Sequence, residues 1–168
     1  MSKVCDNKSV GIIIRKGDDF AVILRKNYPV AYAFIAGHLD GDTFEVSAVK
    51  EAREEGTIII TELKEKLAEK YHNSCKREGG SWHEWKIFEA TKWSGELKAS
   101  SDAKEAYWKS RAELRDLADR TIYFSDKLGI PLEKISELDA ALNKNPEWIK
   151  NPGLETVWLL LLRSVGIL

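Results

Sequence analysis

The stretch that decides the fold runs from residue 36 to residue 58 and reads AGHLDGDTFEVSAVKEAREEGTI. Its glycines and acids at the start are typical of a turn. Apolar residues then recur with helical spacing on one face, at Val46, Ala48, Val49 and Ala52. Asp42 stands three residues before Glu45, in the form of a capping box, and Gly56 provides a stop. We therefore predict a helix over residues 44–55 with Asp42 as its cap.

Three acids of this helix share one face. Glu51, Glu54 and Glu55 stand at i, i+3 and i+4, within one helical turn. Lys50 offsets Glu54, but the position four residues after Glu51 holds Glu55, so the like charges destabilise the helix slightly. Grouped carboxylate oxygens suit Mg²⁺ or Mn²⁺ beside a phosphate substrate. The alternative is a solvated glutamate face, as on most glutamate-rich helices.

The remainder of the chain alternates strands with helices. Strands are expected over residues 10–15, 20–25, 32–39, 57–61 and 83–91, and the first two form a hairpin through Lys16-Gly17-Asp18-Asp19. Helices are expected over residues 62–77, 111–119, 132–142 and 152–165. Leu63, Leu67 and Tyr71 recur every fourth residue in the first of these, and Asn151 caps the last. A turn is expected over 93–96 and a loop over 99–104. The pattern predicts an α/β or α+β sandwich around a mixed sheet.

Composition narrows the class of protein. The chain has 168 residues, with 26 Lys+Arg against 27 Asp+Glu and a net charge of -1. This balance excludes the broad basic surface of a dedicated nucleic-acid binder. A hydrophobic content of 43% is that of a globular fold, and the length predicts a single domain over residues 1–168.

The cysteines and histidines exclude several kinds of site. Cys5 and Cys75 are too few for a disulfide-built scaffold or a zinc site of four thiolates, and neither has the signature of a nucleophile. The histidines lie too far apart in the sequence for a zincin pair: His38, His72 and His83. With no secretory leader and no apolar run of about 20 residues, we expect a cytoplasmic protein without a membrane anchor.

Residues 36–58 resemble the box of the Nudix hydrolase family, in a degenerate form. That pattern is Gly, five residues, Glu, seven residues, then Arg-Glu-apolar-x-Glu-Glu-x-Gly-apolar. Asp42 stands at the first Glu, and the three acids 51, 54 and 55 fall on the metal-binding glutamates. Lys50 replaces the arginine, the loop after Gly37 is one residue short, and Gly56 comes one residue early. Flanking segments 22–25, 34–40 and 105–114 are also similar, so the likeness covers roughly residues 8–120.

The resemblance implies a fold and a reaction. The fold would be the Nudix α/β/α sandwich around a mixed sheet, with a core over about 8–125 and an extension of extra C-terminal helices over about 130–168. The reaction would be the Mg²⁺-dependent hydrolysis, with Mn²⁺ as an alternative ion, of the pyrophosphate linkage in a nucleotide or nucleoside diphosphate derivative. The partner would be a small nucleotide substrate.

The resemblance also implies site residues. Glu51, Glu54 and Glu55 would hold the metal ion, with the Gly37 carbonyl as a further ligand, and Glu51 would alternatively act as a base. Glu105 is the candidate for an acid that completes the catalytic site from a distant loop; the alternative for it is a surface acid. Substrate-binding candidates are Arg25, Phe34, His38 and Lys86. Each has a structural alternative: a solvated cation, a core aromatic or a loop histidine.

Two further functions remain open. A Nudix-like module that binds a nucleotide without hydrolysing it is favoured by Lys50 and the short loop, and a purely structural protein would leave the glutamate face solvated. The apolar C-terminal end, residues 158–162 and Ile167-Leu168, must be covered. It either packs back on the sheet or forms the seam of a homodimer.

Overall fold

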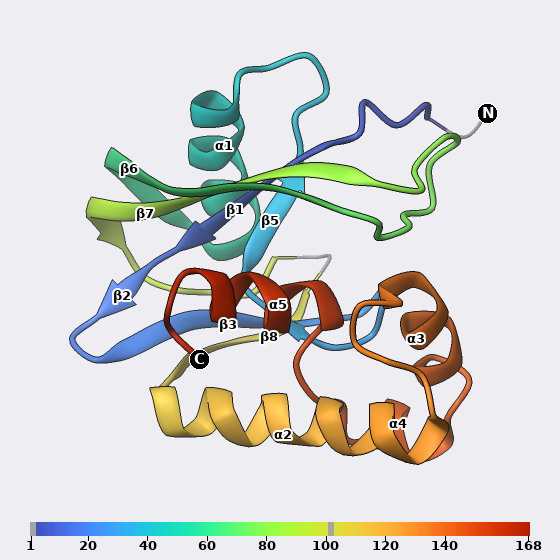
Figure 1. Cartoon of the computed structure of the whole chain (residues 1–168). Coiled ribbons are helices and arrows are strands. Elements are labelled where there is room, and N and C mark those ends of the chain that lie inside the picture. The colour runs from blue at the N-terminus through green and yellow to red at the C-terminus, as the bar shows by residue number, and fades with distance from the viewer. Residues whose placement is uncertain (1–2, 101–102) are drawn as a thin grey trace.

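A computed structural model describes residues 3–100 and 103–168 and shows a mixed α/β fold, as expected (Figure 1). The strands are β1 (Lys8–Ile13), β2 (Arg15–Lys16), β3 (Asp19–Arg25), β4 (Tyr32–Ala33), β5 (Ile35–His38), β6 (Ile58–Tyr71), β7 (His83–Gly95) and β8 (Ala103–Lys109). The helices are α1 (Phe44–Gly56), α2 (Arg111–Leu128), α3 (Ile135–Leu142), α4 (Pro146–Lys150) and α5 (Thr156–Ser164).

The strands form two sheets. The first has the order β5-β1-β7-β6 and is mixed, because β1 runs parallel to β7 and antiparallel to β5. The second is antiparallel, with the order β2-β3-β4 and with β8 also paired to β3. The expected hairpin is confirmed at its turn, where Arg15 pairs with Phe20. On the N-terminal side of Ile14 the two predicted strands separate, because β1 belongs to the first sheet and β3 to the second.

Helices cover both faces of the first sheet, which gives the α/β/α arrangement (Figure 1). On one face α1 packs through the small side chains of Ala48 and Ala52, both fully buried. On the other face α5 places Trp158 against Gly11 of β1, where a Cβ would lie 2.4 Å from the tryptophan ring. Trp158 also stacks on Phe34, with ring centroids 5.1 Å apart. The C-terminal end therefore packs back on the sheet and completes the main core.

The prediction of a helix over residues 62–77 is wrong, because this segment continues β6 as far as Tyr71. β6 pairs along its length with β7, with several bulges. Leu67 and Tyr71 are four residues apart, an even spacing that places both side chains on one face of a strand as well as on one face of a helix. A register shift between Glu65 and Leu67 puts Leu63 on the other face, since Leu63 pairs with Ala90 and Leu67 with Ile87. The long ladder to β7 thus overrides the helix propensity of the Lys and Glu residues.

The predicted helix over residues 44–55 is confirmed, but its cap and its buried face differ. Thr43, rather than Asp42, is the N-cap, and its hydroxyl accepts a hydrogen bond from the Val46 N–H at 3.2 Å. Asp42 pairs instead with Lys50, at 3.8 Å. Val46 is 52% exposed and Val49 38% exposed, so the packed face of the helix consists of its small residues.

The C-terminal helices also start elsewhere than predicted. α5 begins at Thr156, and its predicted cap Asn151 is instead the C-cap of the short, unpredicted α4. The N-cap of α4 is Asn145, which accepts hydrogen bonds from two backbone N–H groups. α2 extends to Leu128, well beyond the predicted residue 119. β7 continues through the predicted turn to Gly95, and β8 begins within the predicted loop; residues 101–102 of that loop lie outside the described residues.

Over residues 3–100 and 103–168, no helix has both the length and the apolar character needed to cross a membrane.

The Gly11–Trp158 contact allows a test of the packing of α5. Gly11→Ala should lower the free energy of unfolding by about 1–3 kcal/mol, since the added methyl group overlaps the indole ring. Urea denaturation would measure it. The double variant Gly11→Ala/Trp158→Leu should lose less than the sum of the two single variants, because the smaller side chain gives room to the methyl group. Additive losses would show that the two residues are not in contact.

Candidate functional site

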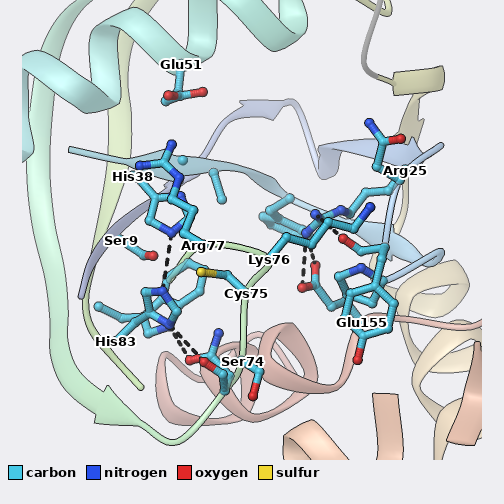
Figure 2. A pocket seen from close by; sticks show the side chains of 18 of the residues that line it. Ser9, Arg25, His38, Glu51, Ser74, Cys75, Lys76, Arg77, His83 and Glu155 are labelled. Atoms are coloured by element: carbon cyan, nitrogen blue, oxygen red, sulfur yellow. Dashed lines mark hydrogen bonds and ion pairs between the residues drawn. The ribbon is translucent and has the colours of Figure 1, made fainter. Parts of the chain in front are cut away.

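A cavity of about 370 Å³ opens beside the edge strand β5. Its walls are α1 with Glu51 and Glu55, the strand residues Gly37 and His38, the loop between β6 and β7, and the segment from Arg25 to Pro29 that follows β3. Figure 2 shows Glu51 pointing from α1 toward this space, with Arg25 and Glu155 on one side and Cys75, Arg77 and His83 on another. The cavity therefore collects charged side chains from distant parts of the chain.

Glu51 lies directly on the backbone of β5. A Cβ at Gly37 would lie 2.1 Å from the Glu51 carboxyl carbon, so only glycine allows α1 to bring this carboxylate so close. Burial, followed by the charges of Glu55 and Glu54, raises the pKa of Glu51 to about 8. The ionised form of this carboxyl group is costly at this position, and a cation beside it would make that form favourable.

The other two acids of the box differ in exposure. Glu55 lines the cavity, and its Oε2 accepts a hydrogen bond from the Ala36 N–H at 3.2 Å. Glu54 is exposed and is not among the lining residues of the described chain. Glu51, Glu55 and the backbone of Gly37 thus face one space with oxygen donors, a set that fits a hard divalent ion.

Arg25, whose side chain is 33% exposed, makes an ion pair with the buried Glu155 at the opposite wall. Its Nη1 donates to both carboxylate oxygens of Glu155 at 3.2 Å, and its Nη2 donates to the Tyr28 carbonyl at 3.1 Å. Behind Glu155 lies the buried Asp139, which accepts a hydrogen bond from the Thr156 hydroxyl at 2.7 Å. Burial, assisted by the charge of Glu155, raises the pKa of Asp139 to about 7. Arg25 therefore balances two buried acids.

Two further substrate-binding candidates, Phe34 and His38, also line the cavity. Phe34 is only 1% exposed and packs between Phe20 and Trp158. His38 faces His83, with their Nε2 atoms 3.3 Å apart. Burial, reinforced by the positive charge of Arg77, lowers the pKa of His38 to about 4, so its ring is neutral at pH 7.

The last two candidates lie away from the cavity as the described residues outline it. Lys86 is on β7, 3.6 Å from a carboxylate oxygen of Glu65, with its ammonium group over the Phe44 ring. Glu105 is an exposed residue of β8, opposite Leu24. Their predicted roles in the reaction stay predictions.

Several lining residues were not singled out from the sequence as site residues. Lys76 and Arg77 come from the loop between β6 and β7, and Arg77 forms an ion pair with Asp40. Glu155 reaches the cavity from the start of α5. The loop falls in the segment wrongly predicted as a helix, so no local pattern indicated that its cations face the glutamates of α1.

The chain is similar to a known family in sequence and to solved structures in fold. A family model described as the NUDIX domain matches residues 6–128. No curated protein sequence matches the chain.

Solved structures share the fold. The chain is similar to a MutT NUDIX hydrolase from Burkholderia pseudomallei, with 17% identity and a TM-score of 0.55 over 63% of this chain and 84% of that one. A NUDIX hydrolase from Nitrosomonas europaea has 18% identity and a TM-score of 0.53 over 66% and 76% of the two chains. The NUDIX domain of Shewanella oneidensis NrtR, in a cocrystal structure with ADP ribose, has 11% identity and a TM-score of 0.57 over 99% and 88%. The last likeness includes the C-terminal helices.

The raised pKa of Glu51 predicts a cost to stability. Because its pKa of about 8 in the folded chain exceeds the unfolded value, the folded state holds the proton more tightly, and stability falls as the pH rises from about 4.5 to 8. Glu51→Gln should therefore raise the Tm by about 2–5 °C at pH 8 in a chelator, and change it little at pH 5. Thermal unfolding at both pH values measures this. Glu45→Gln, an exposed change on the same helix, is the control; an equal effect of both variants would contradict the prediction.

The ion pair of Arg25 predicts a second pH dependence. Arg25→Ala leaves Glu155 and Asp139 unbalanced and should cost about 2–4 kcal/mol at pH 8. At pH 5 the loss should be smaller, because both acids have raised pKa values and take up protons. Urea unfolding at the two pH values tests this, with Arg163→Ala, an exposed arginine of α5, as control. A loss independent of pH would rule out an electrostatic origin.

Proposed function

Because the chain belongs to the Nudix family of pyrophosphohydrolases, we propose that it hydrolyses the pyrophosphate linkage of a nucleoside diphosphate derivative or nucleotide with a bound Mg²⁺ ion. The observation that carries the proposal is the Glu51 carboxylate, packed on the Gly37 backbone and facing the same cavity as Glu55. Mn²⁺ would serve the same oxygen ligands.

The chain's own residues have distinct tasks in this proposal. Glu55 and Glu51 hold the metal ion together with the Gly37 carbonyl, and the exposed Glu54 joins them from the rim. When bound, the metal ion would supply neutralisation of charge on the phosphate oxygens and would make a water easier to deprotonate. Glu105 stays the proposed acid from a distant element. A lower kcat/KM of the variant Glu105→Gln would show that it takes part in the reaction, and an unchanged value would show that it does not.

The cavity suits an anionic substrate that also has an apolar part. Lys76 and Arg77 place positive charge across from the glutamates, which favours binding of a diphosphate. Arg25 and His38 lie on walls that a nucleoside would reach, whereas Phe34, 1% exposed, lies within the wall as a core aromatic. Lys86 stays a proposed contact for a substrate that extends beyond the cavity.

A second candidate function is nucleotide binding without hydrolysis. Lys50 stands where the family has arginine, and in the structure it pairs with Asp42. The NrtR domain, described in complex with ADP ribose, is similar over 99% of this chain. These observations favour a module that senses a nucleotide, with the same cavity as its binding site.

The test is an assay of the full chain with Mg²⁺ or Mn²⁺ on a panel of nucleoside triphosphates, dinucleotides and nucleoside diphosphate sugars, ADP ribose among them. We expect release of a nucleoside monophosphate from one class, with oxygen from ¹⁸O-labelled water in a phosphate product. Glu55→Gln and Glu51→Gln should each lower kcat/KM at least about 100-fold, because charge on the phosphate oxygens loses its stabilisation.

The matched control is Glu45→Gln, the same chemical change on an exposed position of α1 outside the cavity, which should keep wild-type activity. Calorimetric titration with the same panel separates the two candidates. Binding without turnover by the wild-type chain would support the sensing module. Turnover that both glutamate variants retain would contradict the proposed site.

A further inference from the structure

Two cysteines and two histidines meet at one end of the cavity, although 78 positions separate the first from the last. Cys5 belongs to the N-terminal segment before β1, and His38 ends β5. Cys75 lies in the loop between β6 and β7, and His83 begins β7. Figure 2 shows His38, Cys75 and His83 together below Glu51.

The spacing of their donor atoms matches a tetrahedral metal site. All four atoms lie within 4.8 Å of one another. The two Nε2 atoms are 3.3 Å apart, the two Sγ atoms 3.7 Å, and the Cys5 Sγ is 3.3 Å from the His83 Nε2. A tetrahedral Zn²⁺ ion, bonded to nitrogen at about 2.0–2.1 Å and to sulfur at about 2.3 Å, holds nitrogens about 3.3 Å apart and sulfurs about 3.8 Å apart.

The surrounding backbone orients these donors. The His83 Nδ1 lies 2.9 Å from the Asn73 carbonyl oxygen, so this nitrogen carries the proton and Nε2 points its lone pair at the cluster. The Asn7 N–H donates to the Cys5 Sγ at 3.3 Å, a contact that stabilises a thiolate. A Cβ at Gly80 would lie 2.2 Å from the Cys75 Sγ, so glycine is needed for the loop to close over the sulfur.

A disulfide or a simple hydrogen-bonded group accounts less well for the cluster. A disulfide needs sulfur atoms about 2.05 Å apart, far less than the 3.7 Å between Cys5 and Cys75. Hydrogen bonding alone also explains the cluster poorly. Two neutral imidazole rings that face each other through Nε2 can share only one proton, so direct hydrogen bonds give little reason for both rings and a thiol to converge on one point. Two soft thiolates with two imidazoles are a ligand set of zinc.

We propose that Cys5, His38, Cys75 and His83 bind a structural Zn²⁺ ion, at a site separate from the glutamates of α1. Four protein ligands fill the tetrahedral shell, so the ion has no open position for a substrate. Two thiolates balance its charge. It joins the N-terminal segment, the end of β5 and the β6–β7 loop with its following strand, which are far apart in the sequence.

The site bears on the cavity through His38. This residue follows Gly37, on which Glu51 packs, so the ion holds the strand end that supports the acidic cluster. The β6–β7 loop, which holds the ligand Cys75, also carries Lys76 and Arg77 into the cavity. Zinc thus shapes one wall of the proposed active site without taking part in the reaction.

The first test is the metal content of the full chain, expressed with zinc and purified without chelators. Mass spectrometry should find about one zinc ion per chain. Co²⁺ in its place should give the absorption bands of tetrahedral thiolate coordination. Cys75→Ser and His83→Ala should lose the ion. His72→Ala, a change at the histidine outside the cluster, should keep it, as should Glu51→Gln and Glu55→Gln in excess Mg²⁺.

A second test needs no variant to fold. Removal of zinc from the wild-type chain with a strong chelator should lower the Tm by about 10 °C, and Zn²⁺ but not Mg²⁺ should restore it. The proposal is overturned if the purified chain contains no zinc and its Tm is unchanged by the chelator. It is also overturned if Cys75→Ser and His83→Ala retain zinc, or if the intact mass shows a Cys5–Cys75 disulfide. None of these outcomes depends on hydrolytic activity.

Discussion

The packing of the Glu51 carboxylate on the backbone of Gly37 is the constraint on which the functional part of the molecule depends. It requires small residues where α1 meets the sheet, which Ala48 and Ala52 supply, and a residue without a side chain on β5. Because the helix approaches so closely, its acids lie at the edge of the sheet, where the cavity opens. The raised pKa of Glu51 is the electrostatic cost of this position, and a divalent ion would offset it.

Apart from α1, two walls of the cavity are held by different chemistry. Arg25 and the buried Glu155 hold one side through an ion pair that depends on α5 being in place. The Cys5–His38–Cys75–His83 cluster holds the other side, and it joins segments from the N-terminus and the β6–β7 loop. Neither wall is formed by the helix that carries the acids. A change in either wall can therefore alter the cavity while the helix α1 and its three acids stay intact.

The C-terminal helices serve the site as well as the core. Trp158 of α5 fills the space that Gly11 leaves open, and its ring packs against the rings of Phe34 and Trp85. The Tyr32 carbonyl accepts a hydrogen bond from the Glu155 N–H at 2.8 Å, which fixes the start of α5 beside β4. Residues after the matched family segment, 129–168, thus contribute both packing and a charged side chain to the cavity.

By itself the sequence determined the class of fold, the family and the helix with three acids on one face, because these follow from local spacing between residues 36 and 58. It misplaced β6, since a four-residue spacing fits a strand as well as a helix and only the pairing with β7 distinguishes them. It also gave no sign that Cys5, His38, Cys75 and His83 meet. Their contact is decided by the tertiary structure, because the first sheet places β5 and β7 on either side of β1 and brings the N-terminal segment and the β6–β7 loop to the same end.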